Sequence, residues 1–124
     1  MANLRTHDKG VAIEINAGSD CTINSEQILT WKERVGEGLA ESVLQSGLTL
    51  RFRQGGERIK PQGHQHHSPL KNLLPQWNIP PWQRDRIPLL FKQDQLVAVV
   101  GYCVSEQYSV EQGELGFLPQ LCHR

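Results

Sequence analysis

The sequence predicts a single α+β domain that is mainly β and has one or two short helices. Three observations support this class. The 124 residues suffice for one core but hardly for two. Apolar residues alternate with polar ones in several short stretches, which is the two-residue period of a half-buried strand. Two nearly continuous apolar runs are separated by only four residues, as expected for a buried hairpin.

The first 47 residues contain two predicted strands and one ambiguous stretch. Residues 11–15 alternate between apolar and polar side chains, which indicates a strand. A Gly-Ser-Asp turn follows, and residues 21–24 could return as a second strand. Residues 26–46 remain ambiguous, because some apolar residues suit a strand while Gly36 and Gly38 argue against a long helix.

Residues 48–53 form the clearest predicted strand. One face is apolar, and the other carries Arg51 and Arg53. The glycines at residues 55–56 interrupt the strand, and residues 57–60 resume it. This part of the chain therefore predicts a strand with one buried and one cationic face.

A polar loop at residues 62–67 precedes a predicted short helix. Ser68 can cap the N-terminus of this helix, with Pro69 at the first position, where a missing N–H costs nothing. Pro75 opposes continuation past Leu74, so we expect a short or kinked helix. The apolar stripe of this helix consists of Leu70, Leu73, Leu74 and Trp77.

The remaining predicted elements are strands and turns. Residues 79–82 (IPPW) are predicted to be extended or to form a turn. Residues 87–91 and 96–100 are the two apolar runs that pair as the buried hairpin, and residues 102–105 extend the sheet. The rest of the chain is polar, with a weak apolar group in residues 115–121 and no predicted element.

The formal net charge is zero, but the charges are unevenly distributed. Residues 48–92 carry eight basic and two acidic side chains, which gives +6. Residues 1–47 carry four basic and seven acidic side chains, and residues 93–124 carry one and four, so each flank is −3. Because salt screens potentials within about 10 Å, the local charge matters more than the total. The basic middle of the chain is therefore suited to a polyanion.

Several classes of protein are disfavoured by the sequence. The longest apolar run, residues 96–100, is far shorter than the roughly 18 residues of a membrane helix, and residues 1–10 lack the apolar core of a signal peptide. Cys21, Cys103 and Cys122 are an odd number without a Cys-x-x-Cys pair, which favours reduced thiols in a cytoplasmic protein. The sequence contains neither a phosphate-binding Gly-Lys loop nor a nucleophile elbow, so we expect no catalysis by this chain.

Three segments in a fixed order resemble the C-terminal domain of tRNA(Ile)-lysidine synthetases. They are residues 51–61 (RFRQGGERIKP), residues 68–74 (SPLKNLL), and residues 79–91 (IPPWQRDRIPLLF) followed by 96–99 (LVAV). The family pattern has Arg-Phe-Arg-x-Gly-Gly-Glu/Asp, Leu-Lys-Lys and Pro-Pro-Trp-x-Arg-Asp in this order, and the resemblance covers residues 48–104. Asn72 departs from the pattern, since a second lysine is common there.

The resemblance implies both a fold and a role. The fold is similar to a module of the phenylalanyl-tRNA synthetase β subunit and has a sandwich-like sheet. The parent enzymes use ATP and Mg to attach lysine to the wobble cytidine of an isoleucine tRNA, and their ATP-binding loop does not occur here. We therefore expect residues 1–124 to be one non-catalytic domain without its own cofactor, although residues 1–10 and 107–124 lie outside the segment that carries the resemblance.

The same resemblance implies the partners of the domain. They are the acceptor stem of an isoleucine tRNA and the catalytic domain of the parent enzyme, while no membrane contact is expected and an oligomer remains open. Arg51 and Arg53 lie on one strand face roughly 6–7 Å apart, a spacing that suits neighbouring phosphates. Cations beside a helix N-terminus also favour phosphate. The expected RNA-binding residues are Arg51, Arg53, Arg58, Lys60, His64, Lys71, Arg84 and Arg86.

Several of these residues have a plainer structural interpretation. The arginines could form a solvated or salt-bridged strand face, and the glycines at residues 55–56 could make a tight turn rather than a nest for an anion. His64, His66 and His67 favour an RNA-facing loop over a zinc site, because no nearby Cys, Asp or Glu completes a ligand set.

The third segment leaves two further alternatives. Trp82 is predicted to anchor the core or a loop rather than to stack on a base, because its apolar neighbours require burial. One of Arg84 and Arg86 is expected to pair with Asp85 or another carboxylate, which leaves the other for RNA. For the whole chain, the alternative function is a protein-interaction or interdomain-docking module without RNA binding.

Overall fold

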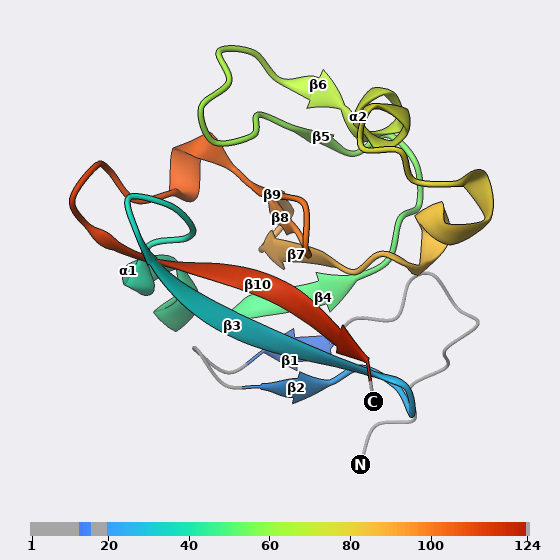
Figure 1. Ribbon diagram of the computed structural model, residues 1–124, viewed down its shortest axis with the longest axis horizontal. Helices are drawn as coiled ribbons and strands as arrows, with labels where there is room; N and C mark the ends of the chain where they lie inside the picture. The colour runs from blue at the N-terminus through green and yellow to red at the C-terminus, as the bar shows by residue number, and fades with distance from the viewer. Residues whose placement is uncertain (1–12, 16–19, 124) are drawn as a thin grey trace.

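Three antiparallel sheets form the fold (Figure 1), and the structure, a computed structural model, describes residues 13–15 and 20–123. The five-stranded sheet has the order β1 (Ile13–Ile15), β4 (Leu48–Arg51), β7 (Leu89–Lys92), β8 (Gln95–Val99) and β9 (Cys103–Val104). The three-stranded sheet has the order β10 (Leu115–His123), β3 (Gln27–Val35) and β2 (Cys21–Thr22). The two-stranded sheet pairs β5 (Arg58–Ile59) with β6 (Ser68–Pro69).

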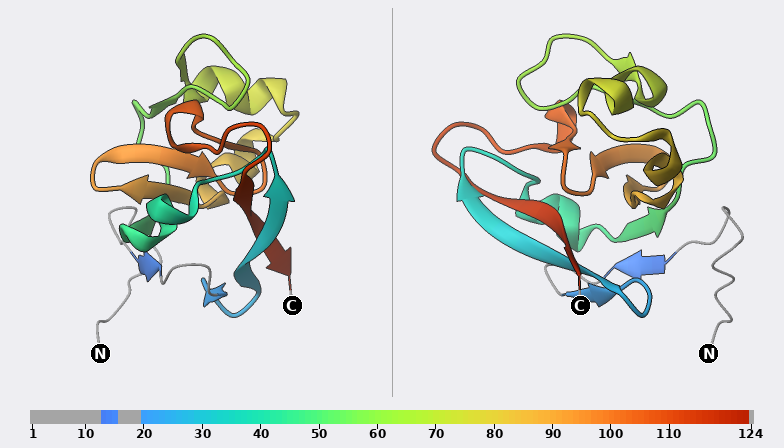
Figure 2. Two further views of the ribbon diagram at one scale, coloured as in Figure 1. Left: turned by 90° about the vertical axis from the view of Figure 1, so that its left-hand side faces the viewer. Right: turned by 45° about the vertical axis from the view of Figure 1, so that its right-hand side comes forward.

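Four short helices connect these strands. They are α1 (Glu41–Gln45), α2 (Leu70–Gln76) and the 3₁₀ helices η1 (Pro81–Arg86) and η2 (Glu106–Tyr108). The two views of Figure 2 show that the β7–β8 hairpin and the β3–β10 pair lie in different layers. The predicted fold class, mainly β with a sandwich-like sheet and few short helices, is therefore confirmed.

The five-stranded sheet is the middle layer, because both of its faces are buried. One face packs against the three-stranded sheet and α1, where Leu29, Leu44 and Leu50 are among the buried residues. The other face packs against α2 and the segment around η1, where Leu74 and Leu89 are buried. Burial on both faces is what nearly continuous apolar strands require, so the predicted hairpin of residues 87–91 and 96–100 is confirmed as β7 and β8.

A β-bulge in the β7–β8 hairpin determines which side chains of β8 pack on each face of the five-stranded sheet. The register shifts between Leu90, which is opposite Ala98, and Phe91, which is opposite Leu96. Val97 is therefore an extra residue on β8. Because of this insertion, Leu96 and Val99 both reach the core on the α2 side although they are three positions apart.

The longest pairing in the molecule joins two strands that the sequence did not identify. β3 and β10 pair from Gln27–His123 to Val35–Leu115, and β3 occupies the ambiguous stretch of residues 26–46. Loop residue Leu39 then exchanges backbone hydrogen bonds with Phe117 at 2.8 and 3.0 Å. Gly38 is tightly constrained here, since a Cβ at this position would lie 2.7 Å from the backbone of Phe117.

Residues 21–24 were predicted to return as a second strand, and Cys21–Thr22 do form the strand β2, but it does not pair with the first strand. β1 pairs with β4, whereas β2 pairs with β3 in another sheet. A short strand does not encode its partner, so neighbouring strands in the sequence need not be neighbours in space. Val11 and the Gly18-Ser19 part of the predicted turn lie outside the described residues.

The predicted start and end of the short helix are wrong. Ser68 and Pro69 form β6, and Pro69 occupies the N-cap position of α2 without a side-chain hydrogen bond. Pro75 lies inside the helix, which continues to Gln76. A proline is tolerated in the last turn of a helix because only one backbone hydrogen bond is lost there. In α2 it is the bond to the carbonyl of Lys71, which is an exposed residue. Residues 79–82 were predicted to be extended or to form a turn; Pro80 is extended, and Pro81 and Trp82 begin the 3₁₀ helix η1.

Candidate nucleic-acid interface

The expected RNA-binding residues do not share one surface. Arg51 and Arg58 line a hollow of about 290 Å³ beside the loop between β4 and β5. His64 and Arg86 line two other hollows, on the side of the molecule formed by β10 and the β8–β9 turn. The cations are therefore divided between a surface around the β4–β5 loop and a groove beside β10.

Arg51 is held in place by three neighbours. Its Nη2 donates a hydrogen bond to the carbonyl of Gln93 at 3.3 Å and lies 4.0 Å from Oδ1 of Asp94. Its guanidinium carbon lies 4.7 Å from the centroid of the Phe91 ring, which is a cation–π distance. A phosphate at Arg51 would have to compete with Asp94, although this carboxylate is fully solvated and so competes only weakly.

Arg53 and Arg84 are both used to fix η1. Arg53 Nη1 lies 3.6 Å from Oδ1 of Asp85, and its buried Nε has no hydrogen-bond partner among the described residues. Nε of Arg84 donates to the carbonyl of Ile79 at 3.0 Å. The structure therefore gives Asp85 a partner from another segment, and Arg84 fixes the loop through a carbonyl rather than through a carboxylate.

The glycine pair after β4 forms a concave backbone that already binds an anion of the chain itself. The Glu57 carboxylate accepts hydrogen bonds from the backbone N–H of Gln54 at 2.8 Å and of Gly55 at 3.0 Å. Gly55 and Gly56 both adopt a positive φ, as the tight turn requires. The two sequence-based interpretations, a turn and an anion nest, therefore coincide, with Glu57 in the place of the anion.

The remaining cations of this surface are more accessible. Arg58 and Lys71 have exposed side chains, and the backbone pairing of Arg58 with Pro69 brings their segments close together. Lys60 is half-buried, and its carbonyl accepts a hydrogen bond from the N–H of Glu106 at 2.7 Å. Arg58 and Lys71 are therefore the cations near the β4–β5 loop that are most accessible to a phosphate.

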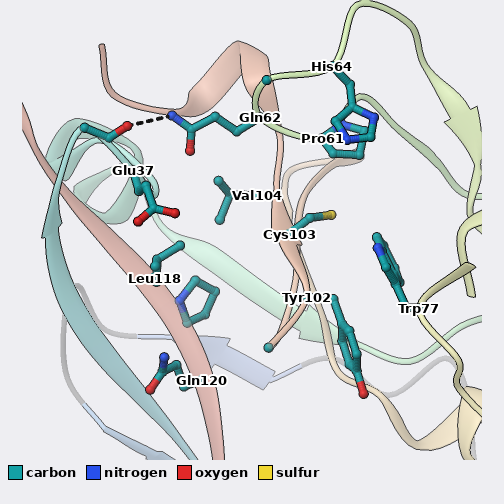
Figure 3. A pocket seen from close by; sticks show the side chains of 14 residues that line it. Glu37, Pro61, Gln62, His64, Trp77, Tyr102, Cys103, Val104, Leu118 and Gln120 are labelled. Atoms are coloured by element: carbon teal, nitrogen blue, oxygen red, sulfur yellow. Dashed lines mark hydrogen bonds between the residues drawn. The ribbon is translucent and has the colours of Figure 1, made fainter. Parts of the chain in front are cut away.

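The groove beside β10 consists of two adjoining hollows of about 550 and 570 Å³. They share Gly101, Tyr102 and Gln120, so they form one continuous depression. Figure 3 shows the first hollow, with Trp77 and Tyr102 on one side and Glu37 on the other. The Trp77 and Tyr102 rings are stacked, with centroids 5.4 Å apart and an interplanar angle of 21°.

The backbone that carries Tyr102 is firmly held. Tyr102 donates its N–H to the carbonyl of Val99 at 2.9 Å, and Gly101 donates to the carbonyl of Pro119 on β10 at 3.1 Å. Gln62, at the other end of the groove, bonds the carbonyls of Gly36 and Val110, both at 3.2 Å. The walls of the groove are thus tied to one another by hydrogen bonds across three segments of the chain.

Cys103 lines the groove but is not a candidate nucleophile. Burial raises the pKa of its thiol to about 12, and a hydrogen bond with the backbone of Val99 acts weakly in the opposite direction. The thiol is therefore protonated at neutral pH, as expected for a cysteine in apolar surroundings. Burial also raises the pKa of Cys21, and all three cysteines are free.

Trp82 contradicts the prediction that it anchors the core or a loop. Its side chain is 76% exposed on η1, while the neighbouring Ile79 and Ile87 are buried. The 3₁₀ helix turns the ring away from these two residues, so apolar neighbours in the sequence did not predict its burial. Trp82 therefore joins Arg86 as an exposed side chain of η1.

The histidine loop shows no sign of a metal site. His64, His66 and His67 are exposed, and the described residues contain no group of three or more His, Cys, Asp or Glu side chains that could hold a metal ion. Within the same residues, no helix has the length and apolar character needed to cross a membrane.

Sequence comparison assigns the chain to a family. Residues 48–120 match the family described as the TilS substrate C-terminal domain. This chain belongs to that family. The predicted resemblance to the C-terminal domain of tRNA(Ile)-lysidine synthetases is therefore confirmed. The match includes β4, residues 115–120 of β10 and everything between them, so it covers both the β4–β5 loop and most of the groove.

Individual relatives of this TilS C-terminal domain agree with the assignment. The tRNA(Ile)-lysidine synthase of Coxiella burnetii is 43% identical over 86 residues, which are 69% of this chain and 19% of the relative. That of Legionella pneumophila strain Paris is 51% identical over 61 residues, which are 49% of this chain and 14% of the relative. The chain thus spans less than a fifth of the length of these relatives.

A solved structure confirms the fold. The crystal structure of a TILS C-terminal domain superimposes with a TM-score of 0.68 at 16% sequence identity, over 90% of this chain and 97% of the other. At this level of identity the likeness concerns the arrangement of the strands and helices.

Proposed function

We propose that this TilS C-terminal domain is a non-catalytic module that docks the acceptor stem of an isoleucine tRNA for an ATP-dependent tRNA(Ile)-lysidine synthase in the cytoplasm. ATP, Mg and lysine would bind to the catalytic part of that enzyme, because this chain does not contain the ATP-binding loop of the family. The observation that carries the proposal is an overlap. The family match, residues 48–120, contains the whole basic stretch of residues 48–92 with its net charge of +6.

Docking of this kind requires contacts that recognise shape and backbone rather than base sequence. Exposed cations supply such contacts to phosphates, and Arg58 and Lys71 are exposed near the β4–β5 loop. The exposed ring of Trp82 on η1 adds a surface on which an unpaired base or a ribose could pack. Binding energy gained far from the chemistry would then orient the tRNA in the intact enzyme.

The test is RNA binding by this chain across a salt series. Two ligands are compared, a minihelix with the sequence of the isoleucine acceptor stem and the corresponding anticodon stem-loop. The proposal expects preference for the minihelix and a steep linear fall of log K with log salt, since several phosphates are neutralised. Equal binding of both RNAs would contradict the assignment to the acceptor stem, and no binding at low salt would contradict RNA docking altogether.

A second function, docking against another domain, is favoured by one specific observation. Val35 and Leu115 are opposite each other at one end of the β3–β10 pair, and their side chains are 68% and 49% exposed. An exposed apolar pair on a regular strand end suits contact with protein rather than with RNA. The substitution of both residues by threonine should leave RNA binding unchanged but weaken association with a separately produced catalytic domain.

A further inference from the structure

The groove beside β10 differs in chemistry from the cationic surface around the β4–β5 loop. Among the described residues, its second hollow is lined by Arg86, His123, three glutamines, Tyr102 and uncharged residues (Ile87, Val100, Gly101 and Leu121), and by no carboxylate side chain. In the same described part of the chain, Glu37 in the first hollow is the one acidic residue that lines the groove. Among the described residues, Arg86 has no ion-pair partner, in contrast to Arg51 and Arg53. This half of the groove therefore offers an unneutralised cation to an anionic ligand.

The aromatic pair gives the groove a flat and rigid platform. Trp77 covers one face of the Tyr102 ring, yet the tyrosine remains 45% exposed, so its free surface is the opposite face and the edge. The turn that carries it is fixed to β10 by the hydrogen bond from Gly101 to Pro119. A preformed aromatic face loses little entropy when a planar ligand stacks on it.

Polar groups suited to the edge of a base surround this platform. The side-chain amides of Gln83 and Gln120 line the groove and make no hydrogen bond with another described residue. Each amide has both a donor and an acceptor, which can pair with the edge of a nucleobase. A stacked base requires that the nucleotide be unpaired, because the faces of bases inside a duplex are already covered by their neighbours.

We propose that this groove binds unpaired nucleotides at the end of the docked RNA stem, with a base stacked on Tyr102 and the adjoining phosphate at Arg86. In an acceptor stem these are the single-stranded 3′ nucleotides. The inference rests on the proposed function and extends it, since the paired stem would contact Arg58 and Lys71 while the tail enters the groove. A segment of a partner protein is a different occupant, and the stacked aromatic pair, the cation of Arg86 and the glutamine amides favour a nucleotide over it.

The experiment compares three RNA probes on the full chain: an acceptor minihelix with its unpaired 3′ tail, the same minihelix made blunt, and the free tail as an oligonucleotide. The tailed minihelix should bind about tenfold more tightly than the blunt one, as expected for one stacked base. Tyr102→Ala should remove this preference and leave the blunt minihelix unaffected, while Tyr102→Phe should retain it. With Trp31 and Trp82 replaced by phenylalanine, quenching of the remaining Trp77 fluorescence by the tail provides a readout within the groove itself.

Charge substitutions provide the matched comparison. Arg86→Gln should lower affinity for the tailed minihelix about fivefold and change blunt binding little, whereas Arg34→Gln, on the exposed part of β3 outside the groove, should change neither. Equal affinity for the tailed and blunt minihelices would overturn the proposal while leaving stem docking intact. So would a tail preference that survives Tyr102→Ala, since the groove would then belong to another partner.

A failure of the proposed function can be told apart from a failure of the groove. If neither minihelix binds, the proposal of stem docking is wrong. Binding of the free oligonucleotide then tests whether the groove by itself binds single-stranded RNA. Binding of the oligonucleotide that depends on Tyr102 would support the groove as a single-strand site by itself. No binding of the oligonucleotide at low salt would overturn it.

Discussion

Two regions of this domain carry arginines in opposite electrostatic settings. Around the β4–β5 loop, Arg51 and Arg53 lie beside Asp94 and Asp85, and the Glu57 carboxylate fills the backbone nest. In the groove beside β10, Arg86 has no ion-pair partner among the described residues. The sequence places Arg51, Arg53 and Arg86 in the same basic stretch, so only the fold reveals which of these cations are already neutralised. The number of arginines in a segment is therefore a poor measure of its affinity for phosphate.

The largest expected effect concerns chemical reactivity in the groove. With Cys21→Ser and Cys122→Ser in place, Cys103 should react with iodoacetamide at pH 8 at least about a hundredfold more slowly than an ordinary thiol, because so little of it is thiolate. Mass spectrometry of the time course measures this rate. Fast alkylation would show that the wall of the groove opens to solvent. The groove would then not be the rigid platform that distinguishes it from the β4–β5 loop.

The same thiol implies a pH dependence of stability. Its pKa in the folded state is raised to about 12, so its contribution to stability is complete below the unfolded value near 9 and is lost as the pH rises towards 12. Urea denaturation between pH 8 and 11 should therefore show a steeper alkaline loss in the wild type than in Cys103→Ala. Parallel curves for the two proteins would contradict the burial of this thiol.

Next in size is the effect of emptying the nest at the β4–β5 loop. Glu57→Ala leaves the N–H groups of Gln54 and Gly55 without their acceptor and should lower the free energy of unfolding by about 1–2 kcal/mol. Glu33→Ala, on the exposed part of β3, serves as the control and should change it by less than about 0.5 kcal/mol. Equal effects of the two substitutions would show that Glu57 does not hold the loop.

The arginines of the two regions can be compared directly by RNA binding. Arg86→Gln should lower affinity for a tailed acceptor minihelix about fivefold and reduce the salt slope by about 0.7–0.9, as for one lost phosphate contact. Arg51→Gln should cost twofold or less, because Asp94, Gln93 and Phe91 already hold that guanidinium. A larger loss for Arg51 would reverse the comparison and place the main phosphate contact at β4.

The smallest expected effect would make the two regions more alike. Asp94→Asn removes the carboxylate beside Arg51 and should raise affinity for the minihelix about twofold at low salt, with stability unchanged because this exposed pair contributes little. Filter binding at two salt concentrations measures the gain, which should shrink at the higher one. A loss of affinity would indicate that Asp94 orients Arg51 for binding rather than competing for it.

The parts of the fold that were predictable are those with strong local patterns. The β7–β8 hairpin was predicted because two apolar runs buried on both faces leave few alternatives. β10 was missed because Leu118 interrupts the alternation of Leu115, Phe117 and Leu121 and because Pro119 argues against a strand. The carbonyl of Pro119 accepts from Gly101, away from β3, so its missing N–H also points away from β3 and no ladder bond is lost.

The candidate site was less predictable than the fold. The cationic residues were visible in the sequence, but their pairing with Asp94 and Asp85 depends on contacts between separate segments. Trp82 was expected to anchor the core or a loop and is exposed, whereas Trp77 and Tyr102 form a stack that sequence spacing does not show. One signal in the sequence could have indicated an exposed aromatic side chain. Tyr102 follows Gly101 in a tight turn directly after a buried strand, where a large ring has little room to be buried.

The late position of β10 in the chain also has a consequence for synthesis on the ribosome. One wall of the groove is formed by Gln120, Leu121 and His123, and the facing wall by residues 83–87 and the turn at Gly101. A nascent chain that has emerged only as far as β9 therefore has the arginines of the β4–β5 loop but half of the groove, and β3 has no partner on its β10 side. Translation of β10 completes the groove, so a product that ends after β9 would retain the basic side chains of residues 48–92 and lack one wall of the groove.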